Sequence, residues 1–568
     1  MGKSNDNNTY DAIVVGSGIS GGWAAKELCD KGLKTLVIER GRNVEHLKDY
    51  PTTFKNPWDF PHRGRNTIEV LKDNPVVSRC YAFNETAAHF FLKDKDQTYT
   101  QEQPFDWIRG NQVGGKSLLW ARQVQRWSRF DFEGPARDGF AVPWPFGYDE
   151  LAPWYSYVER FIGVSGNKDG LEVLPDGEFL PPWQFNTCET SIRESIVSRY
   201  KNRHVVIGRC AHLTQPQQVH IEQGRGQCQA RSLCERGCPY GGYFSSNSST
   251  LPWAKKTGNL SLLPDSVVHS VIYDDRKGKA TGVMVMDMHT KKMTAYYAGI
   301  IFVNASTLST NHILLNSVSA RFPQGLGNDN GLLGKFVAFH NYRGSLTATM
   351  EGMLDAYYFG RRPCAVMMPN FRNVYKQDSN FQRGYMTFYS ATRQGWSRAV
   401  PDDIGLGESL KDTLTGAGGW SVYMMMQGET IPKESNHVRL SKDKVDEMGL
   451  PELIVSVGYD HNDELVLKDF SEQAAEMLDV AGAKNIAFHD SRQAPGLDIH
   501  EMGGVRMGLD PKTSLLNGWN QLHTCKNVFV TDGACMTSTG TQNPSLTFMA
   551  ITARAVDYGV EELKKGNL

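Results

Sequence analysis

The stretch "YDAIVVGSGISGGWAAKELCDKGLKTLVIERG", residues 10–41, decides the fold. Residues 10–15 are apolar and rich in β-branched side chains, which predicts a buried strand. A helical pattern follows and stops at Gly32, and a second apolar strand then ends at Glu39. The chain is therefore expected to open with a strand–helix–strand unit close to its N-terminus.

Gly16, Gly18 and Gly21 form the pattern G-x-G-x-x-G between the first strand and the helix. The first glycine permits a tight turn, the second lets backbone N–H groups approach a pyrophosphate, and the third lets the helix pack on the strand. The helix N-terminus favours an anion, and Glu39 is placed to accept hydrogen bonds from a ribose. The pattern predicts a dinucleotide site rather than an ordinary strand–helix turn, and by itself it does not separate NAD from FAD.

The composition is that of a soluble protein with more than one lobe, since 40% of the 568 residues are hydrophobic and 22% are charged. The net charge is −1 and no basic stripe stands out, so nucleic acid is not expected as a partner. No apolar run approaches the roughly 18 residues of a membrane-spanning helix. The polar start has neither a signal-peptide core nor a twin-arginine motif, which predicts a cytoplasmic chain or one exported on a partner's signal.

The strand–helix pattern returns near the C-terminus, while the middle of the chain is rich in predicted strands. We therefore expect an α/β fold, α+β overall, in which a Rossmann-like nucleotide-binding domain built from discontinuous segments carries a β-sheet-rich substrate domain. The predicted segments are 1–50, 200–334 and 496–568 for the nucleotide-binding domain, and 51–199 and 335–495 for the substrate-binding domain and its linking segments.

Three further stretches carry a resemblance to a known family. They are "GGKSLLW" (114–120), "HEMGGVRMG" (500–508) and "VFVTDGACMTSTGTQNPSLTFMAITARA" (528–555). Together with the N-terminal glycines, they resemble the ordered motifs of the glucose-methanol-choline (GMC) oxidoreductases across nearly the whole chain. The resemblance implies FAD rather than NAD, and oxidation of an alcohol to a carbonyl.

The resemblance also implies roles for individual residues. His500 matches the family's catalytic base, and Asn543 matches its partner, a position that the family fills with His or Asn. Leu119 stands where some relatives carry a histidine bonded to the flavin, so the FAD is predicted to be non-covalent. The turn at 305–307 lacks the glycine that is usual in the family. The implied contacts to FAD are Gly114, Gly115, Ser117, Leu119, Val268 (or its neighbour Val267), Asp532, Gly533 and Pro544.

These residue types suit the chemistry. A neutral histidine near its normal pKa can accept the proton of a hydroxyl at neutral pH, while the carbon gives hydride to flavin N5. An asparagine can hydrogen-bond the same oxygen and hold it in line. Most of the fifteen histidines are expected to be structural, but the glycine-rich context and the downstream Asn–Pro favour a catalytic His500.

Ten cysteines are too few for a disulfide scaffold in a chain of this length. Cys228, Cys234 and Cys238 fall close together with the spacing C-x5-C-x3-C, and Pro239 follows them. The other seven are scattered and are expected to be buried small apolar residues, namely Cys29, Cys80, Cys188, Cys210, Cys364, Cys525 and Cys535.

Three readings of the clustered cysteines remain open. Structural zinc takes four ligands, usually in C-x2–4-C pairs, and His212, His220 or Cys210 would have to complete it at an unexpected interval. A disulfide would leave one thiol over. The ending C-x3-C-P matches ferredoxin-type ligand runs, and three thiolates suit a three-iron cluster, or a four-iron cluster with a ligand of another kind.

The segment 210–242 is similar to that of the bacterial iron–sulfur GMC dehydrogenases for sugars, which carry a three-iron cluster. The resemblance implies a 3Fe-4S cluster that passes electrons singly from reduced flavin to a protein acceptor. No C-x-x-C-H haem-attachment site occurs in the chain, so a haem would belong to a separate cytochrome c. Relatives often travel with a small subunit bearing a twin-arginine signal, which implies a periplasmic enzyme by co-export, with a cytoplasmic enzyme as the alternative.

The activity implied by the resemblance is oxidation of a secondary hydroxyl of a sugar or glycoside to a ketone. C3 of glucose and glucosides, a glucoside 3-dehydrogenase activity, is preferred, while C1, C2 and gluconate-like acids stay open. The alternative is an oxygen-using GMC sugar oxidase, similar to pyranose oxidase, without a working cluster. A non-catalytic flavin-binding subunit is disfavoured, because it would not need the pair His500 and Asn543.

Overall fold

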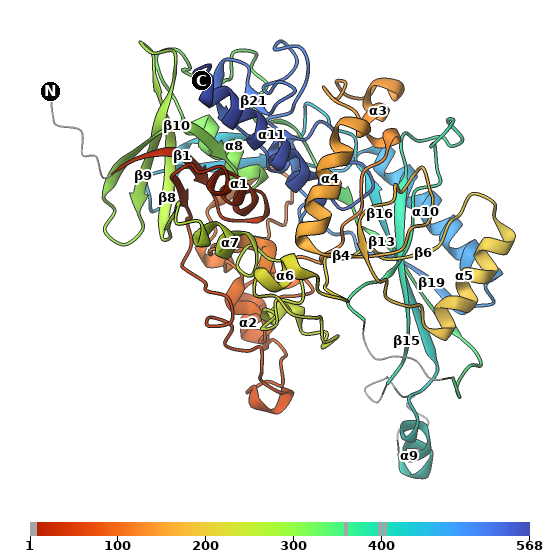
Figure 1. The fold of residues 1–568 in the computed structure, drawn as a ribbon. Helices are drawn as coiled ribbons and strands as arrows, with labels where there is room; N and C mark the ends of the chain where they lie inside the picture. The colour runs from red at the N-terminus through yellow and green to blue at the C-terminus, as the bar shows by residue number, and fades with distance from the viewer. Residues whose placement is uncertain (1–7, 357–361, 396–399, 401–405) are drawn as a thin grey trace.

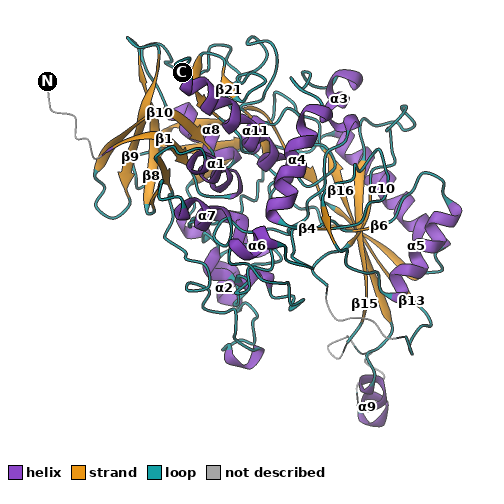
Figure 2. Ribbon diagram, in the orientation of Figure 1, coloured by secondary structure: helices purple, strands orange, loops and turns teal. Residues whose placement is uncertain are grey.

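The computed structural model of the protein describes residues 8–356, 362–395, 400 and 406–568. The chain forms two lobes side by side (Figure 1), each built on a sheet with helices packed against it (Figure 2). Residues 1–7, which open the predicted segment 1–50, lie outside the described residues. The first strand, β1 (Thr9–Val15), and the C-terminal helix, α11 (Ser545–Lys564), both lie on the lobe at the left of Figure 1.

The first lobe is built on an eight-stranded sheet around β1 (Thr9–Val15). β1 pairs in parallel with β2 (Thr35–Ile38) and with β10 (Met293–Val303), and its last four residues are buried, as in a strand covered on both faces. The expected Rossmann-like domain built from discontinuous segments is thus confirmed. The remaining strands are β7 (Leu260–Leu263), β8 (Ser266–Asp274), β9 (Lys279–Asp287), β21 (Gln521–Leu522) and β22 (Cys525–Phe529).

Helices pack against this sheet and against one another. α1 (Ile19–Asp30) contacts both α7 (Thr250–Lys256) and α11 (Ser545–Lys564). α4 (Tyr148–Ile162) contacts α11 from the other side, and α8 (Thr307–Asn316) lies against β8. The C-terminal helix therefore lies next to the helix that follows the glycine-rich turn, which brings the two ends of the sequence to one place.

The second lobe is built on a seven-stranded sheet with α5 (Thr187–Arg199) and α10 (His461–Val480) packed against it. Asp460 starts α10 by accepting hydrogen bonds from the N–H groups of Asn462 and Asp463. β6 lies in this sheet, although it falls within the segment predicted for the other domain. The strands are β6 (Val206–Ile207), β12 (His340–Asn341), β13 (Gly344–Met350), β14 (Val366–Met368), β15 (Tyr385–Arg393), β16 (Trp420–Glu429) and β19 (Lys484–Asp490).

A third sheet has five strands, drawn from segments that are distant from one another in the sequence. Its strand β20 (Met502–Gly504) begins two residues after His500, so this sheet fixes the direction in which that residue enters the site. The other members are β3 (Tyr99–Gln101), β11 (Lys335–Ala338), β17 (His437–Val445) and β18 (Pro451–Ser456), and β4 (Val164–Ser165) pairs separately with β5 (Phe179–Leu180).

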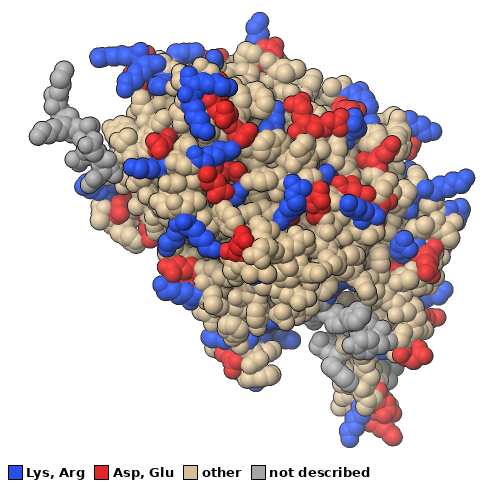
Figure 3. Space-filling view, in the orientation of Figure 1, with Lys and Arg blue, Asp and Glu red and all other residues tan. Residues whose placement is uncertain are grey.

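The remaining elements are short. Among the described residues no helix is long and apolar enough to cross a membrane. On the face shown in Figure 3, basic and acidic side chains are interspersed, with an uncharged area near the centre. The short helices are α2 (Ile68–Asp73), α3 (Arg129–Asp138), α6 (Gln218–Glu222), α9 (Gly407–Thr415) and 3-10 turns at Pro57–Asp59, Val77–Arg79, Ala88–Phe90, Asp94–Asp96, Gly115–Leu118, Cys234–Arg236 and Gly533–Cys535.

Candidate active site

A cavity of about 770 Å³ lies where the carboxyl ends of β1 and β2 face the seven-stranded sheet. Ligands of open α/β sheets bind at this edge. Gly21, Gly114 and Pro544 lie behind the cavity wall, and the three clustered cysteines do not line it. The sequence-predicted residues that do line it are Gly16, Gly18, Glu39, Gly115, Ser117, Leu119, Val268, His500, Asp532, Gly533 and Asn543.

The glycine-rich turn has the geometry that a pyrophosphate requires. Gly16 has a φ of +92°, and a side chain there would overlap the Asn304 carbonyl. A side chain at Gly21 would overlap the Gly16 carbonyl, so the helix packs tightly on the turn. At Gly18 nothing lies within 4 Å of the place where a Cβ would stand, so its backbone is open to the cavity.

Ser17 connects two of the predicted motifs by hydrogen bonds. Its hydroxyl donates to Oε2 of Glu39 at 2.5 Å and accepts from the N–H of Gly114 at 2.9 Å. The N–H of Gly41 donates to Oε1 of Glu39 at 3.0 Å. The backbone N–H of Ser17 also donates to Oε2 at 3.1 Å, so Oε2 accepts two hydrogen bonds and Oε1 keeps one lone pair for a ribose hydroxyl. Burial raises the pKa of Glu39. The turn, the acid and the glycine segment therefore form one connected wall that fits a dinucleotide.

The segment after Gly114 is rigid. Gly114 has a φ of +87°, and a side chain there would overlap the Asn247 amide. The Ser117 hydroxyl donates to the Gly114 carbonyl at 2.6 Å and accepts from the N–H of Ser246 at 3.1 Å. Leu119 lines the cavity as an apolar wall. The absence of a covalent link to FAD remains a prediction.

Asp532 and Gly533 line the cavity after strand β22 of the eight-stranded sheet. The Asp532 carboxylate accepts hydrogen bonds from the Thr310 hydroxyl at 2.6 Å and the Ala534 N–H at 3.0 Å, and burial raises its pKa to about 6. Nearby Ser306 has a φ of +75° and a ψ of 156°. Serine therefore adopts a nearly glycine-only conformation in the turn where the family usually has glycine.

His500 and Asn543 are brought together at the cavity. Asn543 Nδ2 lies 3.3 Å from His500 Nε2. Burial lowers the pKa of His500 well below its ordinary value, so the ring is neutral. Asn543 Oδ1 is buried and has no hydrogen-bond partner within the part of the chain that the structure describes. The pair thus offers a neutral imidazole and an open amide oxygen to a hydroxyl group.

Two residues at the site were missed by sequence reasoning. His340 Nδ1 lies 2.8 Å from His500 Nδ1. Asp498 Oδ2 accepts hydrogen bonds from the backbone N–H groups of His340 at 3.0 Å and of His500 at 3.2 Å. Ile499, which lies between Asp498 and His500 in the sequence, has a φ of +63°, and this value is rare for a β-branched residue. His340 stands alone in "FHNYRG", so no spacing signal could have separated it from the structural histidines.

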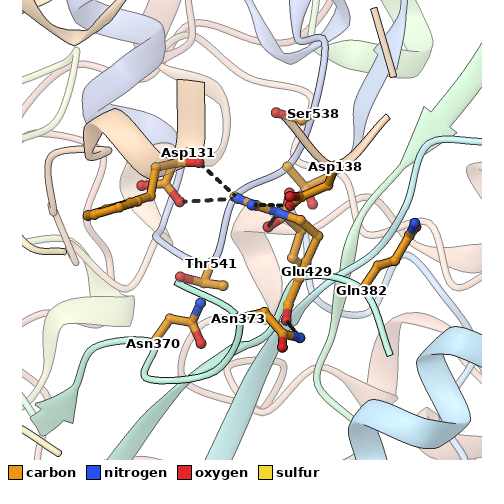
Figure 4. A network of polar contacts seen from close by, with 12 residues as sticks. Asp131, Asp138, Asn370, Asn373, Gln382, Glu429, Ser538 and Thr541 are labelled. Atoms are coloured by element: carbon orange, nitrogen blue, oxygen red, sulfur yellow. Dashed lines mark hydrogen bonds and ion pairs between the residues drawn. The ribbon is translucent and has the colours of Figure 1, made fainter. Parts of the chain in front are cut away.

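A buried charge network supports the loop that carries Asn543. Arg383 donates from Nε to Glu429 at 2.9 Å and from Nη1 to Asp138 at 3.0 Å. Gln542 Nε2, one residue before Asn543, donates to Asp131 at 2.9 Å. Figure 4 shows Asp131 and Asp138 from α3 and Glu429 from β16 converging on one group, the Arg383 guanidinium. The loop is therefore held by ion pairs that reach from α3 to β16.

The clustered cysteines differ from the others. The seven scattered cysteines are buried, as predicted, whereas Cys228, Cys234 and Cys238 are half-buried. Burial, together with the two neighbouring thiols, raises the pKa of the Cys228 thiol to about 11. Among the described residues, no three His, Cys, Asp or Glu side chains converge on a point that could hold one metal ion. A three-iron cluster differs, because each thiolate binds a separate iron atom.

The cysteine segment is hydrogen-bonded to the cavity wall. The hydroxyl of Tyr243 donates to the Leu118 carbonyl at 2.8 Å. The indole N–H of Trp120 donates to the Phe244 carbonyl at 2.9 Å. The 3-10 turn Cys234–Arg236 also contacts the 3-10 turn Gly115–Leu118. The turn that carries Cys234 therefore lies against the segment that the resemblance assigns to the flavin.

A Rossmann-like dinucleotide site beside a neutral histidine and an asparagine defines an oxidoreductase that acts on alcohols. The chain belongs to the GMC oxidoreductase family, whose models match residues 10–337 and 432–552. It is an FAD-dependent enzyme that acts on CH–OH groups.

Relatives with different activities are similar over the full length. Fructose dehydrogenase large subunit from Gluconobacter japonicus is 26% identical and covers 99% of this chain and 100% of its own. Paromamine 6'-oxidase from Streptomyces fradiae is also 26% identical, covering 97% and 91%. The structure of pyridoxine 4-oxidase from Mesorbium loti superposes with a TM-score of 0.61 at 16% identity, covering 97% and 99%. The predicted fold class is thereby confirmed.

Proposed function

We propose that the protein is a dehydrogenase that oxidises a secondary hydroxyl of a sugar or glycoside to a ketone, with C3 of a glucoside as the preferred position. The observation that carries the proposal is the His500–Asn543 pair at a cavity whose far wall mixes aromatic and polar groups. Tyr342, Tyr423 and Gln493 line that wall. Sugars present hydroxyls beside apolar ring faces, and such walls suit both.

In this proposal His500 Nε2 accepts the proton of the reacting hydroxyl, and Asn543 holds the hydroxyl oxygen in line. FAD, held non-covalently by the glycine turn, Glu39 and the Gly114 segment, supplies the hydride acceptor when it is bound. The depressed pKa of His500 keeps the ring unprotonated at neutral pH, which is the state a base requires.

The second part of the proposal concerns the electron exit. We assign Cys228, Cys234 and Cys238 to an iron–sulfur cluster, most simply 3Fe-4S, which passes electrons singly to a cytochrome c. Two observations support it: these thiols are half-buried while the other seven are buried, and their segment is hydrogen-bonded to the cavity wall.

Partners and location belong to the same proposal. One relative is a large subunit by name, which supports a multi-subunit enzyme. A small subunit with a twin-arginine signal would export this chain to the periplasm. Expression with and without the neighbouring subunit, followed by cell fractionation, tests this part, and an unchanged location without the subunit contradicts it.

The central test is anaerobic mixing of the purified holoenzyme with methyl β-D-glucopyranoside in a stopped-flow spectrometer. His500→Ala is expected to keep bound FAD and to slow flavin reduction by about 10²–10⁴-fold, the usual contribution of a general base. Unchanged reduction kinetics contradict the assignment. Iron and sulfide assays with EPR test the cluster, and we expect three irons per FAD and a loss of iron in Cys234→Ser.

An oxygen-using sugar oxidase is the second candidate. It is supported by the similarity to an enzyme named as an oxidase. Stoichiometric hydrogen peroxide under air, from a preparation that contains FAD but no iron, would favour it over the dehydrogenase.

A further inference from the structure

We propose that His340 is a positioning residue that fixes His500 in the Nδ1–H tautomer and so leaves Nε2 as the proton acceptor. The inference rests on the proposed role of His500 as the base. A histidine can act as a base only at the ring nitrogen that carries no proton, and its other nitrogen decides which one that is.

The first step is the protonation state of His340. Its Nε2 lies 3.2 Å from the Thr539 carbonyl oxygen and 3.0 Å from the Gly540 carbonyl oxygen. Carbonyl oxygens only accept hydrogen bonds, so Nε2 carries the proton. The ring is fully buried, and burial lowers its pKa to about 4, which keeps it neutral. Its Nδ1 is therefore a lone-pair acceptor.

The second step is the protonation state of His500, which follows from that of His340. The two Nδ1 atoms are 2.8 Å apart, and one proton must lie between them. Because His340 Nδ1 has none, His500 Nδ1 donates it. A neutral His500 then has an unprotonated Nε2, whose lone pair accepts a hydrogen bond from Asn543 Nδ2 at 3.3 Å beside the cavity.

The backbone holds both rings in the positions that this hydrogen bond requires. Asp498 Oδ2 accepts the N–H groups of both histidines, and Ile499 between Asp498 and His500 is kept at a φ of +63°. A β-branched residue adopts this conformation only when the surrounding structure enforces it. When a hydroxyl proton moves to His500 Nε2, the ring becomes a cation, and its Nδ1–H still donates to neutral His340.

The test combines two substitutions with a matched control. His340→Phe removes the acceptor, whereas His340→Asn keeps an oxygen acceptor close to the position of Nδ1. His220→Phe is the control, because His220 is equally buried, has its Nε2 3.0 Å from the Arg160 carbonyl oxygen and lies away from the cavity. All are compared as holoenzymes.

The first readout is NMR of protein labelled with ¹⁵N at histidine, with the His500 signals assigned from their loss in His500→Asn. We expect a protonated Nδ1 and an unprotonated Nε2 in the native protein and in His340→Asn, and a proton on Nε2 in part or all of the His340→Phe molecules. A proton on Nε2 of His500 in the native protein overturns the inference, whatever the substrate is.

The second readout is anaerobic flavin reduction by methyl β-D-glucopyranoside. A general base supplies a rate enhancement of about 10²–10⁴-fold, and part of it is lost when only a fraction of the His500 rings is in the tautomer with an unprotonated Nε2. We therefore expect flavin reduction in His340→Phe to be slower by about 10–10³-fold. His340→Asn is expected to stay within about tenfold of the native rate. If His340→Phe matches His220→Phe while His500→Ala is slow, the inference fails and the proposed function stands. If His500→Ala is also fast, the proposed base itself is wrong.

Discussion

Replacing Arg383 by methionine should destabilise the protein and disturb the active site at the same time. The Arg383 side chain is 5% exposed and its partner Glu429 is 1% exposed, so the pair lies in the interior. Two more carboxylates, of Asp131 and Asp138, lie within 4.0 Å and 3.0 Å. Methionine fills much of the same volume but leaves these carboxylates without their cation.

The magnitude follows from the burial. Removing one partner of a buried pair costs about 3–5 kcal/mol, because the remaining charge stays in the interior. At about 2.1 cal/mol/K per residue, the entropy of unfolding 568 residues together is about 1.2 kcal/mol/K, so the melting temperature should fall by about 3 °C. The fall should be larger at pH 8 than at pH 6, since Glu429 and Asp131 must then take up protons to stay buried.

Activity should fall by a separate route. Asp131 holds Gln542, and Gln542 precedes Asn543. A looser loop misplaces the asparagine beside His500, and we expect flavin reduction to slow by about tenfold or more. Differential scanning calorimetry and anaerobic stopped-flow measure the two effects on the same samples.

The matched control is Arg129→Met on the same helix, α3. Its pair with Asp149 has exposed fractions of 61% and 68%, so less than about 1 kcal/mol is expected. The double variant with Glu429→Gln should recover part of the stability lost by Arg383→Met. A melting temperature within 1 °C of the native value would refute the reasoning about burial. A lower melting temperature with native reduction kinetics would refute the link to Asn543.

Three other predictions follow from single positions. Ser306→Gly should stabilise the holoenzyme by about 1 kcal/mol. The backbone strain at its φ of +75° is about 1–3 kcal/mol, which exceeds the entropy penalty of glycine. A lower melting temperature of the variant in calorimetry would contradict this. Gly18→Ala should leave the melting temperature of the apoprotein unchanged, since a Cβ there meets nothing within 4 Å, but should weaken FAD binding by about tenfold or more in a fluorescence titration. Asp463→Asn should flatten the pH dependence of stability: burial raises the pKa of Asp463 from 3.8 to about 7, so its folded form keeps a proton that the unfolded form releases, and stability is lost as pH rises between these values. The loss is at most about 4 kcal/mol, and urea unfolding at pH 5 and pH 8 that shows the native pH dependence in Asp463→Asn would refute it.

The sheet that binds the dinucleotide was predictable because its determinants are local. Apolar residues 10–15, the three glycines and Glu39 act within thirty residues of one another, and the structure keeps each in the expected place. The assignment of β6 was not predictable in the same way. Two residues, Val206–Ile207, are too few to carry a periodic pattern, and their pairing with β14 depends on contacts 160 residues away in the sequence.

The residues of the candidate site also differ in whether the sequence could predict them. His500 and Asn543 stand in motifs, so the sequence could name them, and they do meet at the cavity. His340 and Asp498 have no motif, and their importance arises only from hydrogen bonds formed after folding. Ser306 lies between these cases: the missing glycine is visible in the sequence, but the backbone conformation that serine adopts there is visible only in the structure.

The residues around the proposed base, His500, come from three different sheets. His340 lies on β12 of the seven-stranded sheet, His500 leads into β20 of the five-stranded sheet, and Asn543 precedes α11 on the eight-stranded sheet. No one sheet contains the arrangement that keeps His500 neutral with its Nε2 lone pair facing the cavity. In the proposed mechanism, proton transfer therefore requires all three sheets to be docked, whereas the glycine turn and Glu39, which we propose hold the dinucleotide, lie on the first sheet alone. Binding of the cofactor should accordingly survive perturbations of the second lobe that abolish proton transfer, because the two functions rest on different parts of the fold.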